Sequence, residues 1–479
     1  MDWSDIRESF RNSVVKIRAE VKNFDKRRPY HEQIETVNYG TGFVVDVDKG
    51  YVLTTLDIVD NPLDISCSFQ HMKGRKFKLS LISKCRTRNI ALCKFSDADL
   101  TTAKAWFKNY QFKSIPFGDS YKIKEVSRVI TIGYPDDNLS FKSGYVSGFK
   151  TISNDHFRGE YDDIYSREPT YIIIDTIHRP GMNGSPVIDD HGRTICMIAK
   201  ANDDGRCLAI LSRSIISISK QLTMLSEVTV PNISFDWQHT DKKLTADKCG
   251  DPKISGIYIR NIYPDSLFDK MTSGDVVVRM EYPDHFWQLE DIIFGAEPDT
   301  DKISTLACFF DRFGNVILNI RYTDPTDGKF RFSRCLQRIL EITEVFDSIT
   351  YGVDTTLSIC RGKKWYTLDA KYKPRISDRI IPRPDNVAKL TFSNIECTQL
   401  YISQLMAYPR LRAKALADPN FWYQQRLVIT RILPGGPSVL SEGDIITKIN
   451  NVSVSKITDI NVGLDRYTIE NDRGSVYIS

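Results

Sequence analysis

The stretch that decides the fold runs from Tyr171 to Ile198 and reads YIIIDTIHRPGMNGSPVIDDHGRTICMI. An apolar run ending at Ile174 leads into a loop with prolines and glycines, and Val187 and Ile188 resume a strand. Glycine allows backbone conformations that other residues resist. The stretch therefore predicts a strand, a tight loop and a second strand, an arrangement suited to holding backbone N–H groups at a reaction centre.

The rest of the chain has an ordinary composition for a globular protein. Its 479 residues are 41% hydrophobic and 11% aromatic, too many for one core, so we expect two to four domains. Lys and Arg total 65 against 61 Asp and Glu. The net charge of +4 gives no electrostatic reason to expect nucleic acid or an anionic membrane as a partner.

Cysteine usage and the N-terminus bear on the compartment. The 10 cysteines show neither C-x-x-C pairs nor His/Cys metal spacing, which is typical of buried thiols in a reducing compartment. The charged start MDWSDIRESFRNS lacks the apolar core of a signal peptide, and no run approaches the roughly 18 apolar residues of a membrane span. We expect an intracellular protein of the cytoplasm or nucleus, with no metal, cofactor or disulfide framework.

Short alternating segments with frequent turns recur through the first half of the chain. They predict a mainly β fold, a barrel or sandwich rather than a parallel α/β sheet. The expected strands are residues 13–21, 39–46, 51–60 (ending in a helical turn), 63–69, 76–82, 90–95, 128–132, 144–151, 171–174 and 194–199.

Seven segments in order carry a family resemblance. They are GTGFVVD, GYVLTTLDIVD, RNIALCKF, PFGDS, VITIGYP, SGYVSG and IDTIHRPGMNGSPVIDDHGR. They resemble the protease domain of the HtrA/Deg family of trypsin-like serine proteases over about residues 10 to 220. The resemblance implies a trypsin-like double β-barrel in residues 1–225, with the active site in the cleft between barrels.

The same resemblance places the three catalytic positions. The family's histidine falls at Asp57, its aspartate at Asn89 and its serine at Asn183. A carboxyl group does not relay protons as imidazole does near neutral pH, and an amide is not a useful acyl acceptor. The resemblance therefore implies a pseudoprotease in which all three required groups are replaced, and enzymatic activity is not expected.

The loop itself has two interpretations. It comprises Gly181, Met182, Asn183 and Gly184. Its backbone can keep an oxyanion-hole-like arrangement and hold a peptide carbonyl or carboxylate without cleavage, or it is a relic retained for packing. An alternative nucleophile would be Ser185, with His178 and His191 near in sequence. The plainer interpretation makes Ser185 a small loop residue and both histidines exposed turn residues.

Residues 226–250 read as a linker, and a second unit, residues 251–375, follows. SGIYIRNIYPDSLFDKMTSGDVVVRME resembles a PDZ domain as found after HtrA/Deg protease domains. The resemblance implies that an extended peptide adds as a strand and that Ser255, Gly256 and Ile257 capture its carboxylate. An insertion, a hairpin about Gly362 and a helix within residues 335–349 complete this unit. The helix either flanks a peptide groove or belongs to the core.

Residues 376–479 form a third unit. RLVITRILPGGPSVLSEGDIITKIN resembles a second PDZ domain, and GDVVVRME against GDIITKIN is an internal repeat. Gln425 and Arg426 stand where the loop glycine would be, so packing or self-association is expected instead of carboxylate binding.

These observations lead to one main functional hypothesis and two alternatives. The main hypothesis is a catalytically degenerate HtrA/Deg-like protein that acts as a peptide-binding or assembly scaffold. Its expected partners are peptides, protein C-termini or unfolded segments, and the resemblance implies a homo-oligomer. The alternatives are a divergent active serine endopeptidase and a structural component of a larger complex or particle.

Overall fold

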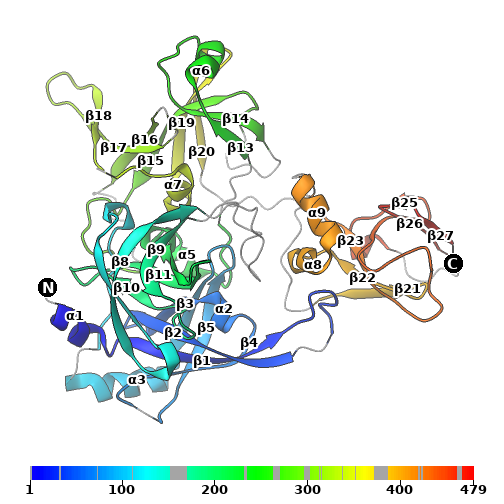
Figure 1. Cartoon of the computed structure of the whole chain (residues 1–479), viewed down its shortest axis with the longest axis horizontal. Coiled ribbons are helices and arrows are strands. Elements are labelled where there is room, and N and C mark those ends of the chain that lie inside the picture. Colours follow the sequence, from blue (N-terminus) through cyan, green and yellow to red (C-terminus); the bar gives the residue numbers. More distant parts are fainter. Residues whose placement is uncertain are drawn as a thin grey trace. The chain divides into compact units, whose positions relative to one another are not determined.

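The chain forms two compact units (Figure 1). The computed structural model describes residues 3–31, 34–72, 74–109, 112–151, 170–230, 235–262, 270–295, 303–311, 313, 315–336, 338–350, 352–371, 387–418, 421, 424–460 and 467–478. The first unit comprises Met1–Val21, Val37–Ile262 and Ser266–Arg375. The second comprises Lys22–Thr36, Tyr263–Asp265 and Ile376–Ser479.

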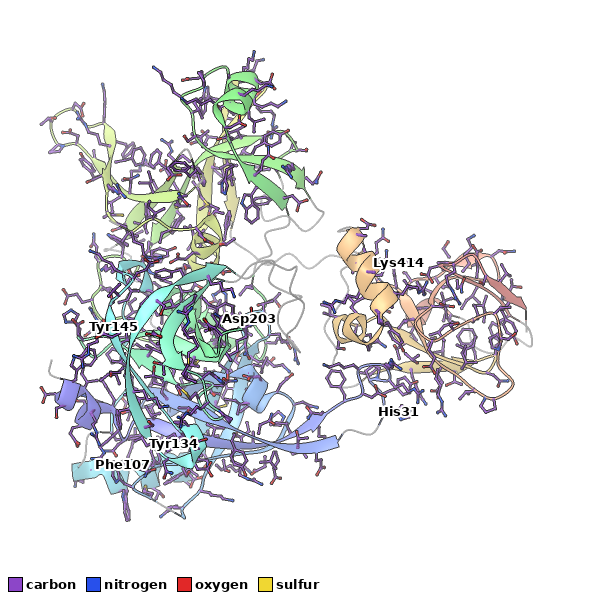
Figure 2. All side chains as sticks on the ribbon, viewed as in Figure 1. His31, Phe107, Tyr134, Tyr145, Asp203 and Lys414 are labelled. Carbon is purple, nitrogen blue, oxygen red and sulfur yellow. The ribbon has the colours of Figure 1, made fainter. Side chains whose placement is uncertain are left out.

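The first barrel closes in the order β1-β2-β3-β6-β5-β4. Its strands are β1 (Val14–Asn23), β2 (Ile34–Asp46), β3 (Tyr51–Thr55), β4 (Pro62–Ser68), β5 (Phe77–Cys85) and β6 (Ile90–Phe95), with α1 (Trp3–Phe10), α2 (Leu56–Val59) and α3 (Asp97–Trp106) around them. Burial in β1 alternates, as expected for a strand with one face in a core. Phe69 fills this core, packing edge-on against Phe77 and against Phe107, which Figure 2 labels.

The second barrel closes in the order β10-β11-β12-β9-β8-β7. Its strands are β7 (Arg128–Gly133), β8 (Ser140–Thr151), β9 (Thr170–Ile177), β10 (Pro186–Ile188), β11 (Thr194–Ala201) and β12 (Arg206–Leu211), followed by α4 (Ser212–Ile216) and α5 (Ser219–Met224). The predicted strand, loop and strand are β9, the 178–185 loop and β10. The predicted mainly β fold with a trypsin-like double barrel is confirmed.

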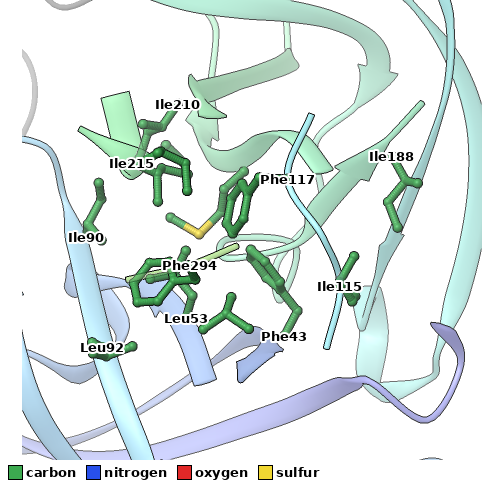
Figure 3. Close-up of a cluster of buried hydrophobic side chains, with 14 of the residues drawn as sticks. Phe43, Leu53, Ile90, Leu92, Ile115, Phe117, Ile188, Ile210, Ile215 and Phe294 are labelled. Atoms are coloured by element: carbon green, nitrogen blue, oxygen red, sulfur yellow. The ribbon is translucent and has the colours of Figure 1, made fainter. Parts of the chain in front are cut away.

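One buried cluster joins the two barrels (Figure 3). Phe43 of β2 and Leu53 of β3 meet Phe117, and the rings of Phe43 and Phe117 lie 6.0 Å apart. Ile188 of β10 enters from the second barrel, and the Phe294 ring lies tilted against Phe117, with the ring centroids 6.1 Å apart. The cluster fixes the two barrels against each other because displacing either one would expose large apolar side chains to water.

The described residues of the first PDZ-like domain form an eight-stranded sheet and two helices. Its strands are β13 (Phe235–His239), β14 (Ile257–Ile262), β15 (Val276–Asp284), β16 (Ser304–Phe310), β17 (Val316–Thr323), β18 (Phe330–Arg334), β19 (Asp354–Arg361) and β20 (Lys364–Lys371); its helices are α6 (Lys242–Cys249) and α7 (Ile342–Ser348). The stretch assigned to a linker from sequence, residues 226–250, instead contains β13, which pairs with β14, and α6. The predicted hairpin about Gly362 is present as β19 and β20.

Buried polar contacts join this domain to the barrels within the first unit. Arg213, 2% exposed, pairs with Asp119 at 2.6 Å and also contacts Asp284 of β15. The hydroxyls of Tyr121 and Tyr282 lie 3.5 Å apart beside this ion pair. Two carboxylates compensate one buried guanidinium, so the two parts of the unit depend on each other.

The second PDZ-like domain lies in the second unit. Its strands are β21 (Lys389–Phe392), β22 (Ile395–Gln399), β23 (Leu427–Ile432), β24 (Ile445–Ile449), β25 (Val452–Ser453), β26 (Thr468–Asn471) and β27 (Val476–Ile478), with helices α8 (Ile402–Ala407) and α9 (Pro409–Ala417). Over the described part of the chain, no helix combines the length and apolarity that a membrane crossing requires.

Candidate functional site

The three positions that the resemblance assigns to the catalytic residues lie together at the junction of the barrels. Asp57 lies in α2, Asn89 precedes β6, and Asn183 lies in the loop between β9 and β10. The Asn183 Nδ2 donates to the Asp57 Oδ2 at 2.6 Å. The Asn89 Oδ1 accepts the backbone N–H of Asp57 at 2.9 Å. The residues assigned to the site from sequence are therefore in direct contact.

A fourth residue, which sequence reasoning treated as an exposed turn residue, joins this set. The His178 Nε2 lies 2.7 Å from the Asn183 Oδ1. Because Asn183 donates its Nδ2–H to Asp57, its Oδ1 is the acceptor and His178 is the donor, which places a proton on the His178 Nε2. The amide thus bridges an imidazole and a carboxylate. No sequence signal beyond proximity to Asn183 pointed to this role.

Two glycines shape the loop around Asn183. Gly181 has φ +87°, and a Cβ there would lie 2.3 Å from the Tyr134 carbonyl oxygen. Gly184 has φ +82°, and a Cβ there would lie 2.0 Å from the Thr41 carbonyl oxygen. At both positions the left-handed backbone conformation and the close approach of a neighbouring carbonyl leave no room for a residue with a Cβ. Thr41 fixes the loop to β2, since its N–H donates to the Asn183 carbonyl at 2.8 Å.

Of the four backbone N–H groups in the loop, two are already used. Met182 donates its N–H to the Arg179 carbonyl at 3.1 Å, and Gly184 donates its N–H to the Ile198 carbonyl at 2.8 Å. Across the described residues, nothing accepts the N–H of Gly181 or of Asn183. Free N–H groups at alternate positions of such a loop are the donors that bind an oxyanion or a carbonyl oxygen.

Ser185 is unsuited to be a relocated nucleophile. Its side chain is 0% exposed, and its Oγ has no hydrogen-bond partner in the described part of the structure. The Oγ packs against Gly133, where a Cβ would lie only 2.0 Å away. His191 is exposed in the turn after Asp189 and makes its contact with Asp190. Neither a base nor a substrate reaches this hydroxyl without opening the barrel.

The predicted carboxylate loop of the first PDZ-like domain leads directly into β14 and is bonded to Thr240. The Gly256 N–H donates to the Thr240 Oγ1 at 2.9 Å, and its carbonyl accepts the Thr240 N–H at 3.2 Å. Ile257 pairs with both His239 and Val277. Carboxylate capture by Ser255, Gly256 and Ile257 stays a prediction, and it would require the Gly256 N–H to give up Thr240.

One open edge of this sheet is β13. This strand is terminal in the strand order and pairs with β14 alone among the described strands. Phe235 of β13 packs edge-on against Phe346 of α7, with ring centroids 6.1 Å apart. A strand edge beside a helix is the arrangement into which a peptide adds as a further strand.

The helix α7 also contacts the second barrel. Glu344 is buried and forms an ion pair with Arg338, and Thr343 lies 3.2 Å from Thr170 of β9 through their hydroxyls. Asp347 accepts the Thr170 N–H at 3.3 Å. Burial raises the pKa of Asp347 to about 6, against the lowering effects of the Arg88 charge and of this hydrogen bond. The predicted helix is therefore shorter than residues 335–349 and mostly core.

The second PDZ-like domain lacks the corresponding open edge. The chain's own β21 pairs with β22 through a turn at Ser393 and Asn394, both with positive φ. Arg426, which replaces the loop glycine, donates to the Phe421 carbonyl at 2.6 Å. Its guanidinium also lies over the Phe421 ring. This domain thus fills with its own residues the positions that a strand-adding peptide would take.

The described residues hold no group of three or more His, Cys, Asp or Glu that could bind a metal ion. All 10 cysteines are free thiols. Burial raises the pKa of several of them, with Cys93 at about 12, so these thiols are poor nucleophiles near neutral pH.

Comparisons with known proteins identify the barrels. Residues 40–197 match the family described as "Trypsin-like peptidase domain". The chain is 24% identical over 253 residues to a probable periplasmic serine protease do/HhoA-like of Haemophilus influenzae, covering 50% of this chain and 49% of that protein. It is 22% identical over 259 residues to the periplasmic serine endoprotease DegP of Escherichia coli, covering 52% and 49%.

A fungal relative and a solved structure are also similar. The pro-apoptotic serine protease NMA111 of Ajellomyces capsulatus is 25% identical over 302 residues, covering 58% of this chain and 27% of that protein. The solved HtrA-type protease AlgW with tripeptide matches with a TM-score of 0.48 and 14% identity, covering 80% of this chain and 99% of that chain. The chain spans about half or less of the length of the curated relatives it matches.

Proposed function

Because the chain belongs to the HtrA/Deg family of trypsin-like serine protease homologues, we propose that it binds peptide segments without cleaving them. The observation that carries the proposal is the hydrogen-bonded set of Asp57, Asn89 and Asn183, which offers no hydroxyl at the nucleophile position and no imidazole at the position of the base. Losing a triad costs on the order of 10⁶ in turnover. A rate of about 10 per second would fall to roughly one event per day.

His178 does not restore the chemistry. Its Nε2–H is directed at the Asn183 oxygen, so the imidazole acts as a donor to an amide and has no hydroxyl to deprotonate. The nearby hydroxyl of Ser185 is buried. The arrangement supports binding because polar groups are present in the right place and a nucleophile is missing.

Two elements supply the proposed binding. The free N–H groups of Gly181 and Asn183 support capture of a carbonyl or carboxylate oxygen at the barrel junction. The edge of β13 supports strand addition in the first PDZ-like domain. Homo-oligomerisation and location in a reducing intracellular compartment are further parts of the proposal, which rest on the family and on the buried free thiols.

The test is binding of an unfolded chain, read together with its integrity. Fluorescein-labelled, reduced and alkylated casein should raise its anisotropy on titration with the purified protein and remain intact on a gel after overnight incubation. The variant Asn183→Trp, which fills the barrel junction, should weaken binding at least tenfold. His191→Trp is the matched control, because that side chain is 65% exposed away from the loop and should leave affinity unchanged.

Two outcomes would contradict the proposal. Casein cleavage by the natural protein would make it an active endopeptidase. Failure to bind casein would remove the peptide-binding role and favour a structural component of a larger complex.

A further inference from the structure

A segment near the N-terminus belongs to the second unit, although the rest of that unit comes much later in the sequence. Lys22–Thr36 joins Ile376–Ser479 in that unit. We call its residues 24–31 the tip; they read FDKRRPYH and connect β1 to β2. Figure 2 labels His31 in the tip, beside the strands of the second PDZ-like domain. Contacts between the tip and this domain therefore join residues almost 400 positions apart.

Tyr30 makes the central contact. Its hydroxyl donates to the Glu396 Oε2 at 2.7 Å and lies 2.9 Å from the Thr430 Oγ1. The Lys389 ammonium lies 4.9 Å from the Tyr30 ring centroid and bonds the second Glu396 oxygen at 2.9 Å. Burial raises the pKa of Tyr30, so the phenol stays protonated and remains a donor to the carboxylate.

The two arginines before Tyr30 add backbone and charge contacts. The Arg27 carbonyl accepts from the Gln404 Nε2 at 3.4 Å and from the Tyr408 hydroxyl at 3.3 Å, both in or next to α8. The Arg28 guanidinium lies 3.3 Å from the Glu442 carboxylate. The tip thus contributes one cation, Arg28, to an acidic side chain of the domain, and the carbonyl of Arg27 to two of its donors.

The surface that receives the tip consists mostly of buried polar groups, and Glu442 is its exposed member. Glu396 is 6% exposed, and Thr430 and Gln404 are 0% exposed. Although burial alone would raise it, hydrogen bonds from Tyr30 and Lys389 lower the pKa of Glu396. Buried donors and acceptors cost free energy when they lack partners. We call Glu396, Thr430, Gln404, Tyr408 and Glu442 the tip receptor.

We propose that the tip receptor is a recognition site for a turn-forming segment in which a basic residue stands two positions before a tyrosine. The chain's own tip fills it as a tethered ligand, and a partner protein that presents such a segment takes its place when the tip leaves. The partner chemistry follows from the contacts: a phenol for Glu396, a backbone carbonyl for Gln404 and Tyr408, and a cation for Glu442.

Tethering explains how one site serves both ligands. A covalently attached segment acts at an effective concentration on the order of millimolar, so only a tight or abundant partner displaces it. The site is also separate from the barrel junction and from β13, because it uses side chains of the second PDZ-like domain, where β21 already covers the β22 edge. The inference therefore stands independently of the peptide-binding function proposed above.

The experiment supplies the tip from outside. The probe is a fluorescein-labelled peptide FDKRRPYH, titrated by anisotropy into the full-length protein and into a variant in which residues 27–30 are replaced by Gly-Ser-Gly-Ser. The variant should bind at least 30-fold more tightly than the natural protein, whose site is filled. A peptide with alanine in place of tyrosine should bind the variant at least tenfold more weakly. Adding Glu396→Gln to the variant should weaken binding of the original peptide by the same factor.

Folding of the variant is checked by circular dichroism. If the replaced tip prevents folding, Tyr30→Ala in the full chain takes its place, because it removes the phenol and retains the connection. A folded variant of either kind that does not bind the peptide overturns the proposal. Equal binding to the natural protein and to the variant overturns it as well, since the probe would then be bound elsewhere.

Discussion

Asn183 connects the two barrels through both its backbone and its side chain. Its carbonyl accepts from Thr41, and its amide bridges Asp57 and His178. An amide can do this because it carries a donor and an acceptor on one planar group, whereas a serine hydroxyl is too short to span both partners. The asparagine at the position that the resemblance assigns to the nucleophile thus makes a structural contact between the barrels.

Asp347 is the residue whose ionisation should affect stability. Its pKa is raised to about 6 from the usual 3.8, chiefly by burial, so the folded protein holds this proton more tightly than the unfolded chain. Stability from this group is present below pH 4 and is lost as the pH rises to 6. Because Asp347 retains some exposure, we expect this loss of unfolding free energy to be about 1–2 kcal/mol.

The measurement is urea unfolding of Asp347→Asn beside the natural protein at pH 4.5 and pH 7.5. The variant should gain stability relative to the natural protein as the pH rises. Ser348→Ala serves as a neighbouring control on the same helix and should show no pH-dependent difference. An equal stability difference for Asp347→Asn at both pH values would show that the carboxyl ionises normally.

At the scale of elements, the two PDZ-like domains differ in one strand. The sheet of the first ends at β13, while β22 of the second is covered by β21. A backbone that already pairs on both sides cannot accept a peptide strand. Among the described strands, β13 of the first domain therefore pairs on one side only, whereas β22 of the second pairs on both sides.

Hydrogen exchange distinguishes these edges. A peptide that binds the first PDZ-like domain should slow amide exchange in Phe235–His239 at least tenfold and leave Ile395–Gln399 unchanged, because only the first strand gains hydrogen bonds. Mass spectrometry of exchanged protein, with and without a saturating peptide, provides the measurement. Equal protection of both strands, or of neither, would refute strand addition at β13.

The sequence predicted the barrels well because period-two alternation and family segments coincide there. β6 matches its expected bounds, Ile90–Phe95. β12 was missed, although RCLAIL is an apolar run, because no family segment marked it. The carboxylate loop was expected before β14, but its bond to Thr240 and the pairing of β14 with β13 were not predicted. Such pairing joins separate segments of the chain, so the local sequence pattern does not reveal it. The contact of Tyr30 with Glu396 was missed for the same reason.

At the scale of the whole molecule, Arg213 joins the barrels to the first PDZ-like domain. It lies between Asp119 and Asp284 with 2% exposure. Replacing it by methionine leaves two buried carboxylates without their cation. Removing one partner of a buried ion pair lowers the free energy of unfolding by about 3–5 kcal/mol.

Chemical unfolding of Arg213→Met tests this. The first unit should lose unfolding free energy by that amount. Arg206→Met is the matched control, because its ion pair with Asp204 lies at the surface, where solvent screening makes a salt bridge contribute little. A loss for Arg213→Met no larger than for Arg206→Met would mean that the buried ion pair does not hold the unit together.

The central claim is that a protease scaffold has kept its geometry and lost its chemistry. It is tested most directly by casein cleavage with the natural protein beside the triple variant Asp57→His, Asn89→Asp and Asn183→Ser. The account predicts no cleavage by the natural protein and measurable cleavage by the variant, since all three positions already lie in contact. Cleavage by the natural protein, or silence in a correctly folded variant, would contradict it.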